Sequence, residues 1–552
     1  MRTERRARLR RLDWWRVLAG ATSGLLAGFA ALAVAELVSA AVRPEAGPVV
    51  AVGGAAIDRT PAPVKDWAIR EFGTNDKLVL QLGILAVLAL LALVLGLVAL
   101  RRRLVGAAGV LLFGVIGALA ATGRPDATGF RDAFPSLAGS VVGAGLLYGL
   151  SRLYGLSGRL ATASTSDVDR ADAPPSSGDV SSADRPAPAE WNRRGFVVAA
   201  AVAAATSAGV GALGKSFNAS RGKEAVASRE AVELPAPASP ARAVPGGAQV
   251  RVPGVSSFTT SNKDFYRVDT ALVVPKVNAD TWSLWIRGEG VTRATRLSFA
   301  DLLGRELIER DITLTCVSNE VGGPYVGNAR WLGVRLADLL TECGVVPPSR
   351  GGLADQLVAR SVDGMTIGTP VDDVMDGRDA MLALGMNGRP LPFTHGFPVR
   401  MLVPGLYGYV SACKWIEDIE LTTFDAYDPY WVKRDWARRA PIKTQSRIDT
   451  PKPFARPKAG TVMVAGVAWA QHRGIDKVEV RVDDGPWRSA DLAAEDTRDT
   501  WRQWSYPWRA TPGGHTLTVR ATDRTGAVQT ARRTRTIPDG ASGRHSVVVT
   551  VD

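Results

Sequence analysis

The chain has 552 residues, 46% of them apolar, and a formal net charge of +13. This length is too great for one compact core, so we expect two to four units. The basic clusters at residues 1–11 and 101–103 abut apolar segments, which indicates membrane topology and argues against nucleic-acid binding. The cysteines are Cys316, Cys343 and Cys413. Because none has C-x-x-C spacing, they support neither a disulfide framework nor a zinc knuckle.

Five stretches in the first 215 residues are long and apolar enough to cross a bilayer, which takes about 20 residues of helix. They cover residues 18–42, 78–100, 104–122, 137–156 and 196–213. Because basic residues resist translocation, the N-terminus and the loop at 101–103 should be cytoplasmic. The first four stretches then form a membrane domain over residues 1–157. Glu36, near the far end of the first stretch, is expected to be an interfacial carboxylate; an intramembrane functional acid is the alternative.

A segment rich in Ser, Asp, Pro and Ala follows at residues 158–192, and we expect a disordered cytoplasmic linker there. Arg193 and Arg194 then precede the fifth apolar stretch, over residues 193–214. This arrangement resembles a twin-arginine export signal, although paired arginines also flank ordinary membrane helices. If the segment is such a signal, everything after it crosses the membrane already folded and lies on the extracytoplasmic side.

A second linker is expected at residues 215–262, because this segment is rich in Pro, Ala and Gly. Residues 263–450 read as mixed α/β. Strands are expected at 281–290, 311–316, 401–405 and 415–421, and amphipathic helices at 298–307 and 334–344. Residues 451–552 read as all-β, with alternating strands near 461–470, 477–487, 515–523 and 545–551 that predict a small Ig-like sandwich.

Three long segments carry a specific resemblance: LTCVSNEVGGPYVGNARWLGVRLADLL, MNGRPLPFTHGFPVRMLVPGLYGYVSACKWIEDIEL and YWVKRDWARRAPIKTQSRIDTPKP. In this order they resemble the sulfite oxidase family of molybdopterin enzymes. The similarity runs from about Phe265 to the C-terminus and leaves out the membrane part. It implies an α+β molybdopterin-binding catalytic domain at 263–450. It also implies a dimerisation domain at 451–552, and therefore a homodimer.

The resemblance gives Cys316 a role, because the family cysteine at this position supplies a thiolate to molybdenum. The pterin dithiolene supplies the other sulfurs. Soft sulfur donors suit such a metal, and a ligating thiolate needs no partner cysteine. A small buried hydrophobe is the ordinary alternative for a lone cysteine. Cys343 and Cys413 lack the surrounding motif and are expected either in the core or beside the residues that bind the metal.

Further positions match the cofactor-binding motifs of the family. The resemblance implies that His395 and Arg400, in THGFPVR, hold the phosphate and pterin of the cofactor, and that Lys414 adds a point charge. The remaining positions are backbone contacts at Ala412 and Cys413, a first pterin-binding loop at Phe265, Tyr266, Arg267, Val268 and Asp269, and a weaker match at Asp363.

The match is less complete at the substrate pocket. Animal and plant sulfite oxidases place an arginine five residues beyond the ligand cysteine, where this chain has Val321. The active-site tyrosine of the family aligns with Trp436, next to Asp435. Arg267 keeps a basic position, and Arg502 is expected to supply another. Loss of one positive donor should weaken binding of a small dianion by about 1.5–3 kcal/mol.

The activity implied is oxygen-atom transfer at a molybdenum centre, with re-oxidation in one-electron steps. No histidine precedes His395 and no cysteine-rich motif is present, so we expect neither haem nor an iron–sulfur cluster in this chain. Electrons must then pass to a separate protein partner or to a quinone.

Three other functions fit parts of the pattern. A reductase of S-oxides, such as oxidised methionine in exported proteins, belongs to the same class of chemistry. A non-enzymatic surface binding module is the alternative of another class, although retention of Cys316, His395 and Arg400 argues against it. A cysteine hydrolase that uses Cys316 and His395 is the third.

Overall fold

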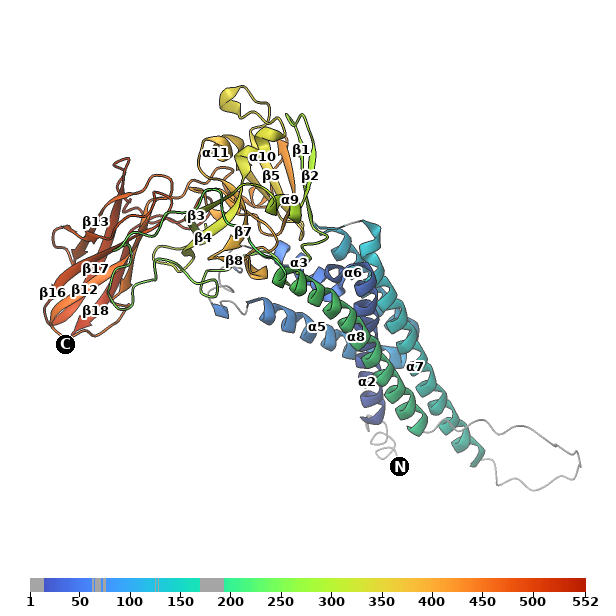
Figure 1. Ribbon diagram of the computed structural model, residues 1–552. Coiled ribbons are helices and arrows are strands. Elements are labelled where there is room, and N and C mark those ends of the chain that lie inside the picture. The colour runs from blue at the N-terminus through green and yellow to red at the C-terminus, as the bar shows by residue number, and fades with distance from the viewer. Residues whose placement is uncertain are drawn as a thin grey trace, which may run out of the picture. The chain divides into compact units, whose positions relative to one another are not determined.

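The computed structural model describes residues 14–61, 64, 71–72, 76–124, 126–127, 129–168 and 193–552 (Figure 1). It divides into two compact units, Met1–Arg221 and Gly222–Asp552. The division agrees with the change from apolar to mixed sequence, although it falls inside a helix that continues from the first unit into the second.

The first unit is helical. Its helices are α2 (Trp14–Val42), α3 (Pro48–Arg59), α5 (Asp76–Arg101), α6 (Arg103–Thr122), α7 (Phe134–Val168) and α8 (Arg193–Glu230), with 3-10 turns η1 (Pro44–Ala46) and η3 (Phe130–Ala133). Among the described residues, five helices are long and apolar enough to cross a membrane, as expected. The short helix α3 was not expected.

Two features bring these helices together. Glycines allow α2 and α5 to approach closely, since a Cβ added at Gly96 would lie 2.9 Å from the Cα of Gly24. At one end of the helices, Arg43 pairs with Asp126 at 2.6 Å and with Asp132 at 2.9 Å, and Arg124 pairs with Asp126 at 2.8 Å. Both buried carboxylates are therefore compensated by guanidinium groups.

Helices α7 and α8 are longer than the apolar stretches that predicted them. Helix α7 continues to Val168, past the expected start of a linker at residue 158, and residues 169–192 lie outside the described part of the chain. Helix α8 continues to Glu230, because residues 215–230 contain good helix formers and the first proline comes only at Pro235.

The rest of the expected second linker is irregular but held in place. The backbone of Ser239 pairs with strand β3 (Leu307–Thr315) through Ser239 N–H to Leu307 O, 3.2 Å, and Glu309 N–H to Ser239 O, 2.9 Å. Arg310 also donates to the Ser239 carbonyl, at 3.0 Å. This part of the segment is therefore attached to the edge of a sheet.

Residues 283–422 form two sheets with short helices, and the C-terminal sheets begin earlier than the expected boundary at 451, with a strand at 445–450. One sheet has the order β2-β1-β10-β5-β6, with β2 (Thr295–Ser298), β1 (Ser283–Gly288), β10 (Ile416–Thr422), β5 (Gln356–Ser361) and β6 (Thr366–Pro370). The other has the order β3-β4-β7-β8, with β4 (Val326–Arg335), β7 (Met381–Met386) and β8 (Arg389–Pro390), and β9 (Arg400–Leu402) beside β7. The helices are α9 (Phe299–Leu303), α10 (Leu336–Glu342), α11 (Val371–Met375) and α12 (Gly408–Ser411), with turns η4 (Pro348–Arg350), η5 (Phe393–His395) and η6 (Val432–Arg434).

The C-terminal region has two four-stranded sheets. One has the order β11-β12-β16-β15, from β11 (Gln445–Thr450), β12 (Gly460–Trp469), β16 (Arg502–Ala510) and β15 (Asp491–Leu492). The other has the order β14-β13-β17-β18, from β14 (Arg488–Ser489), β13 (Ile475–Val482), β17 (Gly513–Asp523) and β18 (His545–Val551). Trp504 and Val464 of the first sheet share one buried core with Val480 and Leu517 of the second. The region is thus β-rich and two-layered, and its Ig-like character stays a prediction.

Strand β16 was missed in the sequence, partly because Pro507 interrupts its pattern. A proline removes one ladder hydrogen-bond donor and is therefore found on open strand edges. Pro507 pairs with Met463 of β12 on one side, whereas on the other side β15 pairs only with Ser505 and Trp504. The proline thus lies beyond the end of the short strand β15. In the described chain, no neighbouring strand there requires the N–H donor that proline lacks.

The hairpin of β3 and β4 positions the predicted ligand. Its antiparallel register runs from Leu307↔Val334 to Thr315↔Val326, so residues 316–325 form the connecting loop. Five consecutive residues of β3, from Asp311 to Thr315, are buried, as a strand inside a core should be. Cys316 is therefore the first residue of a loop whose two ends are fixed by a buried sheet.

The close contact of α2 with α5 predicts a difference between two glycines of α5. Gly96→Val should lower the stability of the helical unit by about 1–3 kcal/mol, because the added methyl groups collide with α2. Gly83→Val is the matched control, since nothing lies within 4 Å of a Cβ built there. Thermal unfolding in detergent checks this, and equal midpoints for the two variants would contradict the packing.

Candidate cofactor site

Cys316 opens a loop that is closed by its own hydrogen bonds. The Cys316 N–H donates to Tyr325 O at 3.0 Å, and the Asn319 N–H donates to Cys316 O at 3.0 Å. The side-chain oxygen of Asn319 accepts from the Tyr325 N–H at 2.8 Å. Burial raises the pKa of the Cys316 thiol, opposed by hydrogen bonds from Ser318 and by the charge of Lys414. Metal ligation would replace the proton that burial favours.

Asn319 has an unused donor in this loop. The side chain is 3% exposed, and its amide nitrogen, Nδ2, has no hydrogen-bond partner within the described chain. A buried unsatisfied donor costs about 1–3 kcal/mol, so such a group indicates a ligand that is to be bound. Asn319 was not among the predicted site residues; its place three residues beyond Cys316, the predicted ligand, was the only signal.

Arg400, at the start of β9, is a buried cation without a carboxylate. It is 6% exposed, and in the described structure no carboxylate lies within 4.0 Å of it. Its guanidinium lies 5.4 Å from the centre of the Trp331 ring, and it donates from Nη1 to His395 O at 3.4 Å. The Nε atom has no partner among the described residues. Burial lowers the pKa of Arg400 to about 10.

His395 lies beside Arg400 and is neutral at physiological pH. Burial lowers its pKa to about 4, and the nearby charge of Arg400 adds to the effect. Its Nε2 atom lies 2.9 Å from the carbonyl oxygen of Asn262, so Nε2 carries the proton and Nδ1 is the acceptor of the neutral ring. The ring packs edge-to-face on Phe265, with centroids 5.6 Å apart.

The segment from Phe265 to Asp269 joins this group through charge and ring contacts. Lys414 Nζ lies 3.0 Å from Asp269 Oδ2 and 3.1 Å from Val268 O, and Arg267 Nε lies 2.8 Å from the same carboxylate. Two cations thus share one carboxylate, so Arg400 adds to an existing positive excess. Tyr266 stacks on Phe265 at 5.2 Å. Burial raises the pKa of Tyr266, and the neighbouring Cys316 adds to the rise.

Cys413 and Ala412 lie next to Lys414 at the backbone. A bridge pairs Arg400 with Lys414, and the Met401 N–H donates to Cys413 O at 2.9 Å. The Cys413 thiol is 3% exposed, and burial raises its pKa, with a further contribution from Asp363. Asp363 lies in the turn between β5 and β6, where its side chain accepts from the Met365 N–H at 3.2 Å. Its charge acts on the Cys413 thiol, which places it near that residue.

The predicted substrate residues are less closely gathered. Trp436 packs on Trp431 and Tyr409, with ring centroids 5.5 and 5.3 Å apart. Asp435 is exposed and has a positive φ of 65° at the end of η6. Arg502 donates to Ala493 O at 2.9 Å and to Ile475 O at 3.0 Å, both in the C-terminal sheets. Across the described chain, no hydrogen bond, ion pair or ring contact joins Arg502 to the group around Cys316.

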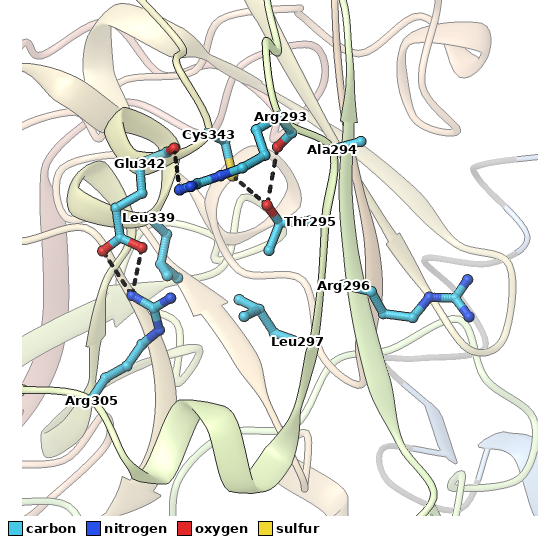
Figure 2. A pocket seen from close by; sticks show the side chains of 9 residues that line it. All are labelled: Arg293, Ala294, Thr295, Arg296, Leu297, Arg305, Leu339, Glu342 and Cys343. Atoms are coloured by element: carbon cyan, nitrogen blue, oxygen red, sulfur yellow. Dashed lines mark hydrogen bonds and ion pairs between the residues drawn. The ribbon is translucent and has the colours of Figure 1, made fainter.

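A cavity of about 300 Å³ lies elsewhere in this region, between β2 and α10 (Figure 2). Arg305 binds both carboxylate oxygens of Glu342 there, at 2.8 and 2.9 Å, and Arg293 donates to the Glu342 carbonyl. Cys343 contacts Thr295 Oγ1 at 3.6 Å. None of the predicted cofactor-binding residues lines this cavity, so it is not the candidate site.

Comparison with known proteins identifies the domain. A profile described as "Oxidoreductase molybdopterin binding domain" matches residues 271–431. Mitochondrial sulfite oxidase of Rattus norvegicus is 29% identical over 289 residues, which cover 45% of this chain and 52% of the relative. Sulfite oxidase of Gallus gallus is 30% identical over 296 residues, which cover 46% of this chain and 63% of the relative. This region is therefore a molybdopterin-binding oxidoreductase domain that is similar to sulfite oxidases.

The similarity is limited to part of each protein. The chain spans about half the length of the mammalian sulfite oxidase that it matches. The crystal structure of the sulfane dehydrogenase SoxCD from Paracoccus pantotrophus is also similar, with 23% identity and a TM-score of 0.47. The match covers 54% of this chain and 84% of that one.

The residues present fit a molybdopterin cofactor of the sulfite oxidase family. The cofactor is anionic and rich in acceptors, and the site offers a buried guanidinium without a carboxylate and two buried donors without partners, Arg400 Nε and Asn319 Nδ2. Cys316 adds a buried thiol next to this group. The donors thus match the groups that the cofactor would bring.

The unpaired charge predicts opposite effects of one substitution on stability and on cofactor binding. Arg400→Met should raise the stability of cofactor-free protein by about 1–3 kcal/mol, because it removes a buried cation that no carboxylate compensates. The same variant should retain much less molybdopterin. Arg456→Met, at an arginine whose side chain is 68% exposed, is the control. Thermal unfolding and pterin fluorescence measure both effects; a destabilised variant with full cofactor content would contradict this reading of Arg400.

Proposed function

We propose that the chain is a membrane-anchored oxygen-atom-transfer enzyme that oxidises sulfite or a related small oxyanion on the extracytoplasmic face. The observation that carries the proposal is the position of Cys316, a buried thiol within a group that has an excess of positive charge and unused donors. The family membership of residues 271–431 supports it.

In this proposal the protein binds and orients, while the cofactor supplies two-electron oxygen-atom chemistry. Cys316 gives a thiolate ligand to the metal. Arg400 and Lys414 neutralise phosphate, and Nδ1 of His395 accepts a hydrogen bond from a pterin donor. Asn319 donates from Nδ2 to an acceptor near Cys316. Phe265 and Tyr266 exclude water from one side, which strengthens each of these charged contacts.

The remaining predicted residues have supporting roles. Backbone groups of Val268, Ala412 and Cys413 contact the cofactor, and Asp269 orients Lys414 and Arg267. Arg267 attracts the anionic substrate. Asp435 and Trp436 shape its entry, with Arg502 further out, and Asp363 supports Cys413.

The five long apolar helices support a membrane location. Electrons released at the site pass to a separate acceptor, since oxidation of sulfite yields two electrons that must leave singly. The C-terminal sheets are the proposed contact of a homodimer.

A second candidate, reduction of S-oxides such as methionine sulfoxide, is favoured by two observations. Val321 is 8% exposed and adds no charge to the loop after Cys316. Trp436, Trp431 and Tyr409 form a cluster of aromatic rings that suits an uncharged, partly apolar substrate better than a dianion. Comparison of sulfite oxidation with reduction of a methionine sulfoxide peptide separates the candidates. Turnover of the peptide alone would remove the sulfite proposal.

Metal analysis of Cys316→Ser tests the proposed function. The molybdenum content of the variant should fall roughly 10-fold or more. Replacing a residue that only supports a metal ligand typically costs about 10–100-fold in affinity, and loss of the ligand itself should cost at least as much. Cys343→Ser is the matched control, since Cys343 is also buried but lines the cavity between β2 and α10. Full metal content in Cys316→Ser, or none in the unaltered protein, would refute the proposal.

A further inference from the structure

The loop that contains Cys316 is held from outside by the C-terminal sheets. The hydrogen bonds described above close residues 316–325 on themselves, and the Gly323 N–H donates to Glu320 O at 2.8 Å within the loop. No backbone hydrogen bond of the described chain joins the glycine pair, Gly322 and Gly323, to β3 or β4. Two side chains from the C-terminal sheets reach this pair, Arg447 of β11 and His545 of β18.

Arg447 joins three segments of the chain. Its Nη1 donates to Gly323 O at 2.8 Å, and its Nη2 donates to Ser256 Oγ at 2.9 Å. Its Nε lies 2.7 Å from Asp449 Oδ1, and Asp449 also accepts from the Ser256 N–H at 2.9 Å. Arg447 is 9% exposed. Hydrogen bonds hold its guanidinium on three sides, and Asp449 neutralises its charge. Arg447 therefore fixes the loop without adding charge to the site.

His545 holds the other glycine by contact. Gly322 has a φ of 81°, and a Cβ built on it would overlap the imidazole of His545. The Ile448 N–H donates to Nδ1 of this ring at 3.0 Å, so the neutral ring carries its proton on Nε2, toward the loop. Gly322 is thus required by both its backbone conformation and the proximity of the ring.

The same sheets also hold the strand that leads to Cys316. Gln471 donates from Nε2 to Thr313 O and to Thr315 Oγ1, both at 3.0 Å. The Trp501 N–H donates to Thr313 Oγ1 at 2.7 Å, and the Thr313 N–H donates to Asp499 O at 2.9 Å. Contacts therefore lie on both sides of Cys316 along the chain.

We infer that Arg447 and His545 are positioning residues for the Cys316 thiolate, and that the C-terminal sheets form part of the metal site as well as any dimer contact. The inference rests on the proposed function, in which Cys316 is the metal ligand. Loss of either contact frees the glycine pair. The thiol then becomes exposed to solvent more often, and the geometry between its sulfur and a bound metal varies more.

Alkylation of the three buried cysteines in cofactor-free, full-length protein tests this. Iodoacetamide labelling at Cys316, Cys343 and Cys413 is followed by peptide mass spectrometry, so that two cysteines report any general loosening. Arg447→Met and Gly322→Ala should raise the rate at Cys316 about 10-fold relative to the other two, because a charged hydrogen bond or a fixed turn is lost. Arg447→Lys, which keeps one donor toward Gly323, should recover part of the protection.

Arg456→Met is the matched control, since it removes another arginine–aspartate pair from the same region, Arg456 with Asp552 at 2.5 Å. It should leave all three rates unchanged. Equal rises at all three cysteines in Arg447→Met, or no rise at Cys316, would overturn the inference. The inference would also be overturned if Cys316 in Gly322→Ala were alkylated at the same rate as in the unaltered protein.

A second readout uses protein loaded with cofactor. The paramagnetic resonance spectrum of partly reduced molybdenum should broaden in His545→Gln and Arg447→Lys at unchanged molybdenum content, and a spectrum identical to that of the unaltered protein would contradict a positioning role. Failure of the proposed function is recognised separately, as absence of molybdenum from the unaltered protein.

Discussion

A guanidinium buried without a carboxylate is the constraint on which the candidate site depends. Arg400 contacts Trp331 and His395, and Lys414 and Arg267 both pair with the carboxylate of Asp269. A protein interior does not hold such a charge without cost, because the low dielectric that strengthens paired charges also penalises unpaired ones. An anionic cofactor offsets this cost, so the same charge that weakens the empty fold supports affinity for the bound group.

Rigid strands place the thiol against this charge. Cys316 follows a strand whose last five residues are buried and paired to β4, whereas Arg400 begins β9, which pairs with β7 of the same sheet. The ligand and the cation therefore belong to one hydrogen-bonded framework. Arg447 and His545 extend this framework from the C-terminal sheets to the glycines beyond the thiol. Part of what resembles a separate dimerisation module thus contacts the loop that would hold the metal.

The sequence allowed several strands and the long helices to be predicted because local patterns determined them, whereas the site residues came from the family resemblance and stay a prediction. The alternation of polar and apolar residues at 311–315 predicts strand β3, and apolar length predicts the five long helices. His395, Arg400, Lys414 and Phe265 lie close together, and their role in holding a cofactor is what the family resemblance implies. Asn319, Arg447 and His545 were not predicted, because their roles depend on contacts between segments far apart in sequence. Arg502 shows the same limit: a motif gives its position, but only the fold shows that its guanidinium bonds to carbonyls in the C-terminal sheets.

The central claim is that the sulfur of Cys316 is bonded to molybdenum. X-ray absorption at the molybdenum edge counts the sulfur neighbours of the metal directly. The account predicts one sulfur neighbour fewer for the molybdenum that Cys316→Ser still retains than for that of the unaltered protein, with the sulfurs of the organic cofactor still present. An identical sulfur count in the two proteins would contradict it.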